Sequence, residues 1–134
     1  MEFLKETTYV DQAKDVMDAL FKPQLDRNGR EKKPQLVTMS KIRNILSMAA
    51  DIYDNVMRVS SQELGPDLVS RIEYLRVRMI YESGREPKVK TFLEAAHLLD
   101  YVKMIGNDKK KFILFYHYLE ALVAFHRFNG GKDN

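Results

Sequence analysis

The side chains best suited to chemistry form one evenly spaced series in the middle of the chain: Arg71, Tyr74, Arg78, Tyr81 and Arg85. Spacings of three, four and three place the first four on one face of a helix, and the fifth continues their direction past the helix end. A guanidinium can bind a phosphate through two hydrogen bonds, and a phenol offers a ring plane or a hydroxyl to a nucleic acid strand. The series is therefore a candidate nucleic-acid-binding face.

The same series also has a purely structural interpretation. The arginines can form ion pairs with Glu73, with Glu82 and with neighbouring helices, while the tyrosines border the core. Most charged stripes on helices are simply exposed to solvent, and exposed ion pairs contribute little. On this helix alone the structural interpretation is the commoner case, so the RNA-binding hypothesis needs support from elsewhere in the chain.

A second stripe on this helix is typical of a face that packs on a core. Leu68, Ile72, Leu75 and Met79 recur at helical spacing, a quarter turn or more away from the basic stripe. Arg76 falls on this apolar side, where a buried and unpaired guanidinium would be too costly. It is either a half-buried member of an ion pair or a contact residue on a face that a partner covers.

Two further basic clusters begin other predicted helices. Lys41 and Arg43 lie in the first turn of one helix, and Lys109, Lys110 and Lys111 begin another. Cations usually favour the C-terminal end of a helix, because the helix dipole is negative there. An anion bound by free amides and by these cations would explain their position. Simple solvation of the side chains is the alternative.

The segment of residues 23–36 is predicted to be a flexible basic loop. It contains two prolines, an Asn-Gly pair and almost no apolar side chain. Its cations, together with the lysine just before it, are Lys22, Arg27, Arg30, Lys32 and Lys33. Loops of this composition often become ordered on a polyanion, although a simple linker has the same composition.

Apolar periodicity predicts an all-α fold, a compact bundle of about five helices in a single domain of residues 1–134. The helices are expected over residues 8–21, 38–57, 66–84, 87–105 and 108–128, followed by a tail at residues 129–134. The last helix is apolar almost all round, so it lies either at the centre of the bundle or partly under another subunit. No strand pattern is found.

The composition defines the class of protein. The chain of 134 residues is 45% hydrophobic and 31% charged, as in an ordinary soluble globular domain. Its net charge is only +3, so an anionic partner must be met by a local patch. The absence of cysteine excludes disulfides and thiolate metal sites. There is no signal peptide and no apolar run of membrane-spanning length, so we expect a soluble cytoplasmic protein.

No catalytic centre is predicted, and neither a cofactor nor a metal is expected. The chain has no glycine-rich phosphate loop, and its histidines are His97, His117 and His126. The last two lie nine residues apart on one helix, so they do not form a close pair that faces one metal. We therefore expect a binding module. An RNA-processing enzyme that uses His117 or His126 is a third hypothesis, which would require cleavage that His→Ala substitution abolishes.

Three segments resemble one known family. They are SKIRNIL at residues 40–46, YLRVRMIYESGR at residues 74–85, and FLEAAHLLDYVKMIG with KKKFILFYHYLEALVAFHRFNGG within residues 92–131. In order and spacing they are similar to the small subunit of the type III-A CRISPR effector, the second Csm protein of the Csm complex. The resemblance covers about residues 37–132, and residues 1–36 match no pattern that we recognise.

The resemblance implies a small helical protein without a catalytic centre. Several copies would stack head to tail along the crRNA-bearing backbone filament and extend to the large subunit. The implied partners are the target RNA, the crRNA–target duplex, other copies of the same chain, and the backbone and large subunits of the complex. Contacts would go mainly to sugar and phosphate, because base pairing supplies the choice of sequence.

The residues within the matching motifs are the RNA contacts that the resemblance implies: Lys41, Arg43, Arg76, Arg78, Arg85, Lys109, Lys110 and Lys111. Arg71 precedes the motif and is a candidate from its place in the basic stripe alone. The aromatic side chains of the last helix would serve subunit stacking, in a head-to-tail contact that need not close on itself. The rival from another class is a helical protein–protein adaptor without direct RNA binding, whose arginines anchor a protein interface.

Overall fold

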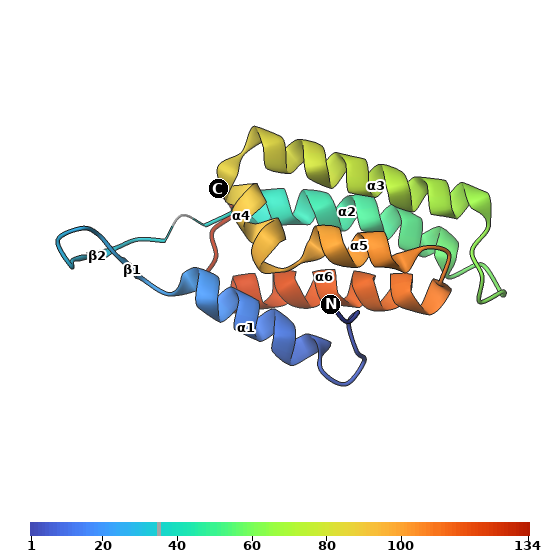
Figure 1. Ribbon diagram of the computed structural model, residues 1–134, viewed down its shortest axis with the longest axis horizontal. Helices are drawn as coiled ribbons and strands as arrows, with labels where there is room; N and C mark the ends of the chain where they lie inside the picture. Colours follow the sequence, from blue (N-terminus) through green and yellow to red (C-terminus); the bar gives the residue numbers. More distant parts are fainter. Residues whose placement is uncertain (35) are drawn as a thin grey trace.

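The computed structural model describes residues 1–34 and 36–134, which form a helical bundle with one projecting hairpin (Figure 1). The helices are α1 (Tyr9–Phe21), α2 (Met39–Val56), α3 (Pro66–Arg85), α4 (Pro87–Ala95), α5 (Leu98–Ile105) and α6 (Lys109–Phe128). A two-stranded antiparallel sheet of β1 (Gln24–Leu25) and β2 (Glu31–Lys32) joins α1 to α2. The predicted all-α bundle is confirmed, with one helix more than expected and this small sheet in addition.

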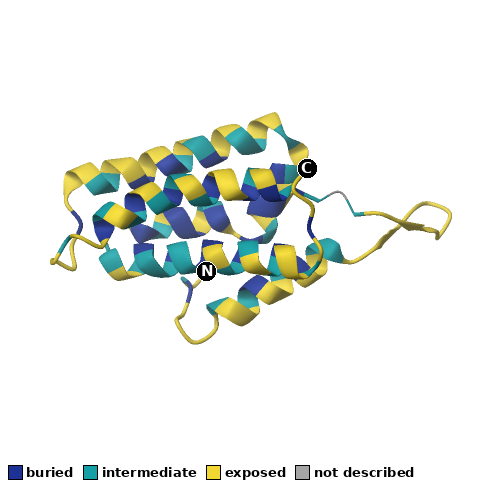
Figure 2. Ribbon diagram, turned by 180° about the vertical axis from the view of Figure 1, so that it is seen from behind, coloured by how far each residue is buried: buried dark blue, intermediate teal, exposed yellow. Residues whose placement is uncertain are grey.

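Helix α6 lies at the centre of the bundle. It packs against α1, α2 and α5, while α3 packs on α2, α4 and α5. Figure 2 shows that the buried residues line the inner faces of the helices. In α6, all of whose residues the structure describes, Phe128 is the one aromatic side chain that is largely exposed, at 79%. The central position explains the apolar composition of this helix, and the expected role of its aromatic side chains in subunit stacking stays a prediction.

Two helices occupy residues 87–105, where the sequence predicts one. Between them His97 has a left-handed backbone conformation, with φ 56° and ψ 32°. The break follows from the buried positions, which change face by about half a turn at this residue. Before the break the buried side chains are Val89, Phe92, Leu93 and Ala96, and after it they are Leu98, Tyr101, Val102 and Ile105. A continuous helix would turn one of these two sets toward solvent.

The segment predicted as a basic loop contains the β-hairpin. Its strands pair through Gln24 with Lys32 and through Leu25 with Glu31. The hairpin extends away from one end of the bundle (Figure 1). Strands of two residues, built from exposed and mostly polar side chains, show no alternation that would reveal them in the sequence. Residue 35 of the predicted loop lies outside the described residues, and the flexibility of the loop and the single-domain organisation stay predictions.

The predicted tail at residues 129–134 is packed against the start of α2. The carbonyl oxygens of Lys132 and Asp133 accept hydrogen bonds from the amides of Met39 and Ser40, at 2.9 and 3.3 Å. The hydroxyl of Ser40 also donates to the Asp133 carbonyl oxygen, at 2.7 Å. The end of the chain therefore caps a helix that begins more than ninety residues earlier.

Candidate nucleic-acid interface

The basic stripe lies on α3. The sequence has clear signals for where this helix begins and for which of its faces packs on the core. Gly65 is the N-cap, Pro66 takes the first helical position, and Asp67 places a negative charge in the first turn, where the helix dipole favours it. Ile72, Leu75 and Met79 are buried and Leu68 is half-buried, so the predicted core stripe is confirmed. Packing of this face fixes the opposite face of the helix toward solvent.

The tyrosines of the stripe are exposed. Tyr74 is 63% exposed and Tyr81 is 52% exposed, so neither ring borders the core as the structural interpretation requires. Arg71 is exposed as well, and Arg78 is half-exposed. Arg71, Tyr74 and Arg78 line a shallow hollow of about 160 Å³ between α2 and α3, which Asp51 also lines from the α2 side.

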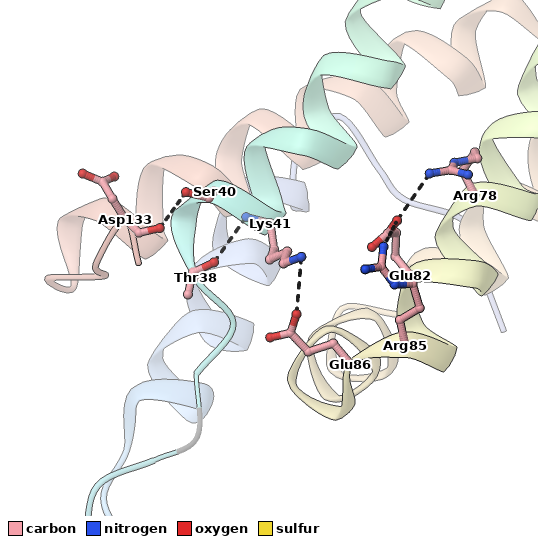
Figure 3. Close-up of polar contacts among 8 residues, drawn as sticks. All are labelled: Thr38, Ser40, Lys41, Arg78, Glu82, Arg85, Glu86 and Asp133. Carbon is pink, nitrogen blue, oxygen red and sulfur yellow. Dashed lines mark hydrogen bonds and ion pairs between the residues drawn. The ribbon is translucent and has the colours of Figure 1, made fainter.

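Two arginines of the stripe share one carboxylate (Figure 3). Arg78 Nη2 lies 3.4 Å from Glu82 Oε1, and Arg85 Nη1 lies 3.6 Å from the same oxygen. The guanidinium carbons of these arginines lie 5.2 and 5.6 Å from the centre of the Tyr81 ring. Since two cations face one anion, this cluster keeps a net charge of +1 next to an exposed ring.

Arg76 is a half-buried member of an ion pair, which is the first of the two roles expected for it. Its side chain is half-buried, and its Nη1 lies 3.3 Å from Glu73 Oε2 one turn away. Part of the structural interpretation is therefore right, because Arg76, Arg78 and Arg85 all have acidic partners on α3 itself. The role of Arg76 as a contact residue stays a prediction.

The amides at the start of α2 already have partners. Thr38 is the N-cap, and its side chain accepts a hydrogen bond from the Lys41 amide at 3.3 Å. The amides of Met39 and Ser40 donate to the C-terminal tail, as described above. Lys41 Nζ lies 3.6 Å from Glu86 Oε2 (Figure 3). Within the described chain, Arg43 is the exposed cation of this turn that has no carboxylate partner.

The lysine cluster lies at the start of α6, at the opposite end of the bundle from the start of α2; α6 itself is roughly 30 Å long. Lys109 Nζ donates to the Val59 carbonyl oxygen, and Lys111 Nζ lies 5.6 Å from the centre of the Phe3 ring. Asp108 is the N-cap of α6, and its side chain accepts a hydrogen bond from the Lys111 amide at 3.1 Å. Lys110 is exposed. The structure therefore does not bring this cluster together with Lys41 or with Arg85, which lie at the opposite end of the bundle.

The acidic partners on α3, Glu73 and Glu82, were expected from the sequence, and both pairings are present. Glu82 can serve two arginines because it lies four residues after Arg78 and three before Arg85. The partners that the sequence did not predict are distant in the chain. The pairing of Lys41 with Glu86, and the capping of α2 by the tail, join distant parts of the chain and have no local signal.

The histidines do not form part of a metal-binding group in the described part of the chain. No group of three or more potential metal-binding side chains is found there. His126 is fully buried, and its Nε2 donates to the Val37 carbonyl oxygen at 2.8 Å. Burial lowers the pKa of His126, and the hydrogen bond to Val37 offsets only part of this effect. It is a neutral core residue. No described helix is both long enough and apolar enough to cross a membrane.

Comparison with known sequences decides the family. The family profile described as Csm2 Type III-A matches residues 14–132. The chain belongs to this family. It is 37% identical over 133 residues to a protein of Streptococcus thermophilus, which covers 99% of this chain and 100% of the relative. That relative carries the name CRISPR system Cms protein Csm2.

Two further relatives with the same name support the assignment to the Csm2 family. A protein of Mycobacterium tuberculosis is 36% identical over 107 residues, covering 80% of this chain and 82% of the relative. A protein of Enterococcus italicus is 39% identical over 94 residues, covering 69% and 67% respectively. The resemblance seen in the sequence is confirmed. It also extends further than predicted, because the family match begins at residue 14 and includes the hairpin.

Proposed function

We propose that this member of the Csm2 family is a non-catalytic small subunit of a cytoplasmic type III-A Csm complex. Several copies stack head to tail along the crRNA-bearing filament, next to the backbone and large subunits. Each copy contacts the sugar–phosphate backbone of the target RNA, paired with the guide, through α3. The observation that carries the RNA-binding part is the exposure of Tyr74 and Tyr81 among three arginines of one helix face.

The ion pairs on α3 do not prevent phosphate binding. Arg85 is exposed and Arg78 is half-exposed, so a phosphate can bind the N–H groups that Glu82 leaves free. Glu82, which is largely buried, holds both guanidinium groups beside Tyr81. The ordering of these long side chains is thus partly complete before RNA arrives, which reduces the entropic cost of binding.

The other predicted contact residues differ in their exposure and in whether they already have a protein partner. Arg43 is exposed near the start of α2, at the end of the bundle where α3 finishes. Lys41, Arg76 and Lys109 already have protein partners, so we propose smaller contributions from them. Lys110 and Lys111, at the far end, can reach the same RNA only if the strand runs along the bundle or if a neighbouring copy brings them to it.

An apolar pair beside the basic stripe supports the stacking part of the proposal. Val77 is 55% exposed and Ile80 is 49% exposed, three residues apart on the outer surface of α3 and next to the basic stripe. Such side chains suit a protein neighbour better than a phosphate backbone. The same observation favours the alternative function, a helical adaptor that contacts only proteins.

The RNA-binding part is tested in the assembled complex with target RNA. We expect an Arg71→Ala/Arg78→Ala/Arg85→Ala variant to lose affinity and to reduce the slope of log affinity against log salt by about 2, or about 0.7 for each lost phosphate contact. The matched control is Arg58→Ala/Lys90→Ala/Lys103→Ala, which removes three exposed cations elsewhere and should change little. Circular dichroism of each variant checks the helical fold.

A substitution that removes a negative charge gives a second test, in which RNA affinity is expected to change in the opposite direction. Glu82→Gln keeps the size of the side chain but removes the anion that Arg78 and Arg85 share, so RNA affinity should rise. If the triple variant binds target RNA as the control does, and Glu82→Gln has no effect, α3 contacts only protein and the adaptor function is supported.

A further inference from the structure

The hairpin between α1 and α2 has no role in the bundle. We call residues 22–33 the arm. It consists of β1, β2 and the turn between them, and all of its side chains are exposed. Figure 1 shows the arm projecting from the end of the bundle without covering any helix. A two-stranded hairpin without an apolar face is marginal in water, so packing does not explain why this one is formed.

The arm carries the excess positive charge of the whole chain. Its five cations, Lys22, Arg27, Arg30, Lys32 and Lys33, outnumber its two acids by three, and the net charge of the full sequence is also +3. The remaining residues contain 17 basic and 17 acidic side chains and are therefore neutral as a whole. A positive potential that can attract a polyanion is thus concentrated on the arm.

None of the five cations forms an ion pair within the residues that the structure describes. The ion pairs that occur there all join residues outside the arm. This separates the arm from α3, where Arg76, Arg78 and Arg85 all have acidic partners. A phosphate at the arm therefore has no internal carboxylate to displace.

The turn of the arm is held by specific hydrogen bonds. Asp26 Oδ1 accepts from the amides of Asn28 and Arg30, both at 2.9 Å. The Asp26 amide donates to the Arg30 carbonyl oxygen at 2.8 Å, and Gly29 has φ 77°, which glycine adopts without strain. Arg27 is thus placed at the tip and Arg30 where the second strand begins. Asp26, one of the two acids of the arm, therefore orders the cations around it.

We propose that the arm is a second RNA-binding element, which contacts phosphates independently of α3. Charge complementarity identifies the partner, because the arm offers five unpaired cations and a single large apolar side chain, Leu25. A protein partner would require a larger apolar contact. The ordered turn reduces the entropy lost on binding, and the projection of the arm lets it reach RNA that does not lie on the bundle.

The first experiment measures binding of the full-length chain to a single-stranded RNA of about 20 nucleotides, beginning at about 20 mM salt. Arg27→Gln/Lys32→Gln/Lys33→Gln should weaken binding at least several-fold and reduce the salt slope by about 2. Its matched control is Arg58→Gln/Lys90→Gln/Lys103→Gln, one arginine and two lysines outside both the arm and α3. The arm does not pack on the core, and the three control residues are exposed. Neither set of substitutions should therefore alter the thermal unfolding midpoint.

A second pair of variants separates charge from the ordered turn. Asp26→Asn and Asp26→Ala remove the same negative charge, but only asparagine retains an oxygen that can accept from the Asn28 and Arg30 amides. We expect Asp26→Asn to bind RNA at least as well as the wild type, and Asp26→Ala to bind several-fold more weakly than Asp26→Asn. Equal binding by the two variants would show that the turn has no part in recognition.

Three results would overturn the proposal. They are absence of salt-sensitive RNA binding by the wild-type chain at low salt, equal loss in the arm variant and its control, and loss of self-association in the arm variant with RNA binding unchanged. The last result would assign the arm to a protein contact. Because the α3 variants are measured in the complex and change no residue of the arm, failure of the arm and failure of the α3 interface can be told apart.

Discussion

His126 has two ring nitrogens with different surroundings. Nε2 donates to the Val37 carbonyl oxygen, while Nδ1 is buried without a hydrogen-bond partner among the described residues. Gly131 covers the second nitrogen closely, since a Cβ built on this glycine would lie 2.0 Å from Nδ1. A proton on Nδ1 would therefore have no acceptor, and the neutral ring is the one that the folded state accommodates.

This arrangement predicts how stability depends on pH. The folded state lowers the pKa of His126 below its ordinary value of 6.5, so below that value the unfolded chain binds more protons than the folded one. The contribution of the neutral ring is complete above about pH 6.5 and decreases as the pH falls toward the folded-state pKa. Urea unfolding at a series of pH values should show this decrease in the wild type and a smaller one in His126→Gln. His117→Gln is the control, and an unchanged profile in His126→Gln would contradict the prediction.

At the scale of elements, α2 depends on the far end of the chain. Its first amides donate to the carbonyl oxygens of Lys132 and Asp133, and Asp133 also forms an ion pair with Arg127 at 2.7 Å. Local capping by Thr38 satisfies one more amide. The helix start is thus shared between a local signal and a contact across the fold.

Removal of residues 132–134 should destabilise the protein by about 1–2 kcal/mol, because the Met39 and Ser40 amides lose their acceptors. The control is Asp133→Ala, which keeps the main-chain carbonyl and loses only an exposed ion pair, at a cost of less than about 0.5 kcal/mol. Chemical unfolding measures both. Equal stability of the truncated and full-length chains would mean that water replaces the tail without loss.

The helices also show how much of the fold could be predicted from the sequence. Long helices with regular apolar spacing, such as α2, α3 and α6, were predicted within a few residues, because periodicity and the Pro66 and Gly106 boundaries are local signals. The break at His97 was not predicted. Residues 98–105 carry apolar side chains on both faces, and these hide the change in which face is buried. The arginine stripe and its acidic partners on the same helix were predicted, but the exposure of the tyrosines depends on packing.

Over the whole molecule, charge and apolar surface are distributed unequally. The arm holds the net positive charge, the bundle is neutral, and the outer side of α3 exposes Val77 and Ile80 beside its arginines. A subunit that contacts both RNA and protein neighbours requires such a division between surfaces, because each kind of partner needs a different chemistry.

Val77→Ser/Ile80→Ser should lower the number of copies that enter the complex without altering the fold, because exposed substitutions change stability by only about 0.5 kcal/mol. Native mass spectrometry of the assembled complex counts the copies. The matched control, Val10→Ser/Met57→Ser, alters two apolar residues exposed elsewhere. If the α3 variant enters in the normal number, this pair of side chains is not a subunit contact.

The contact between the tail and α2 also sets the order of events during synthesis. A ribosome that adds about 5–20 residues per second needs roughly 5–20 s to pass from the start of α2 to the residues that cap it. During that interval α2 exists without its acceptors, and His126 has not yet reached Val37. The first amides of α2 can therefore gain these acceptors only after residues 132 and 133 have left the ribosome, so this part of the fold is completed late.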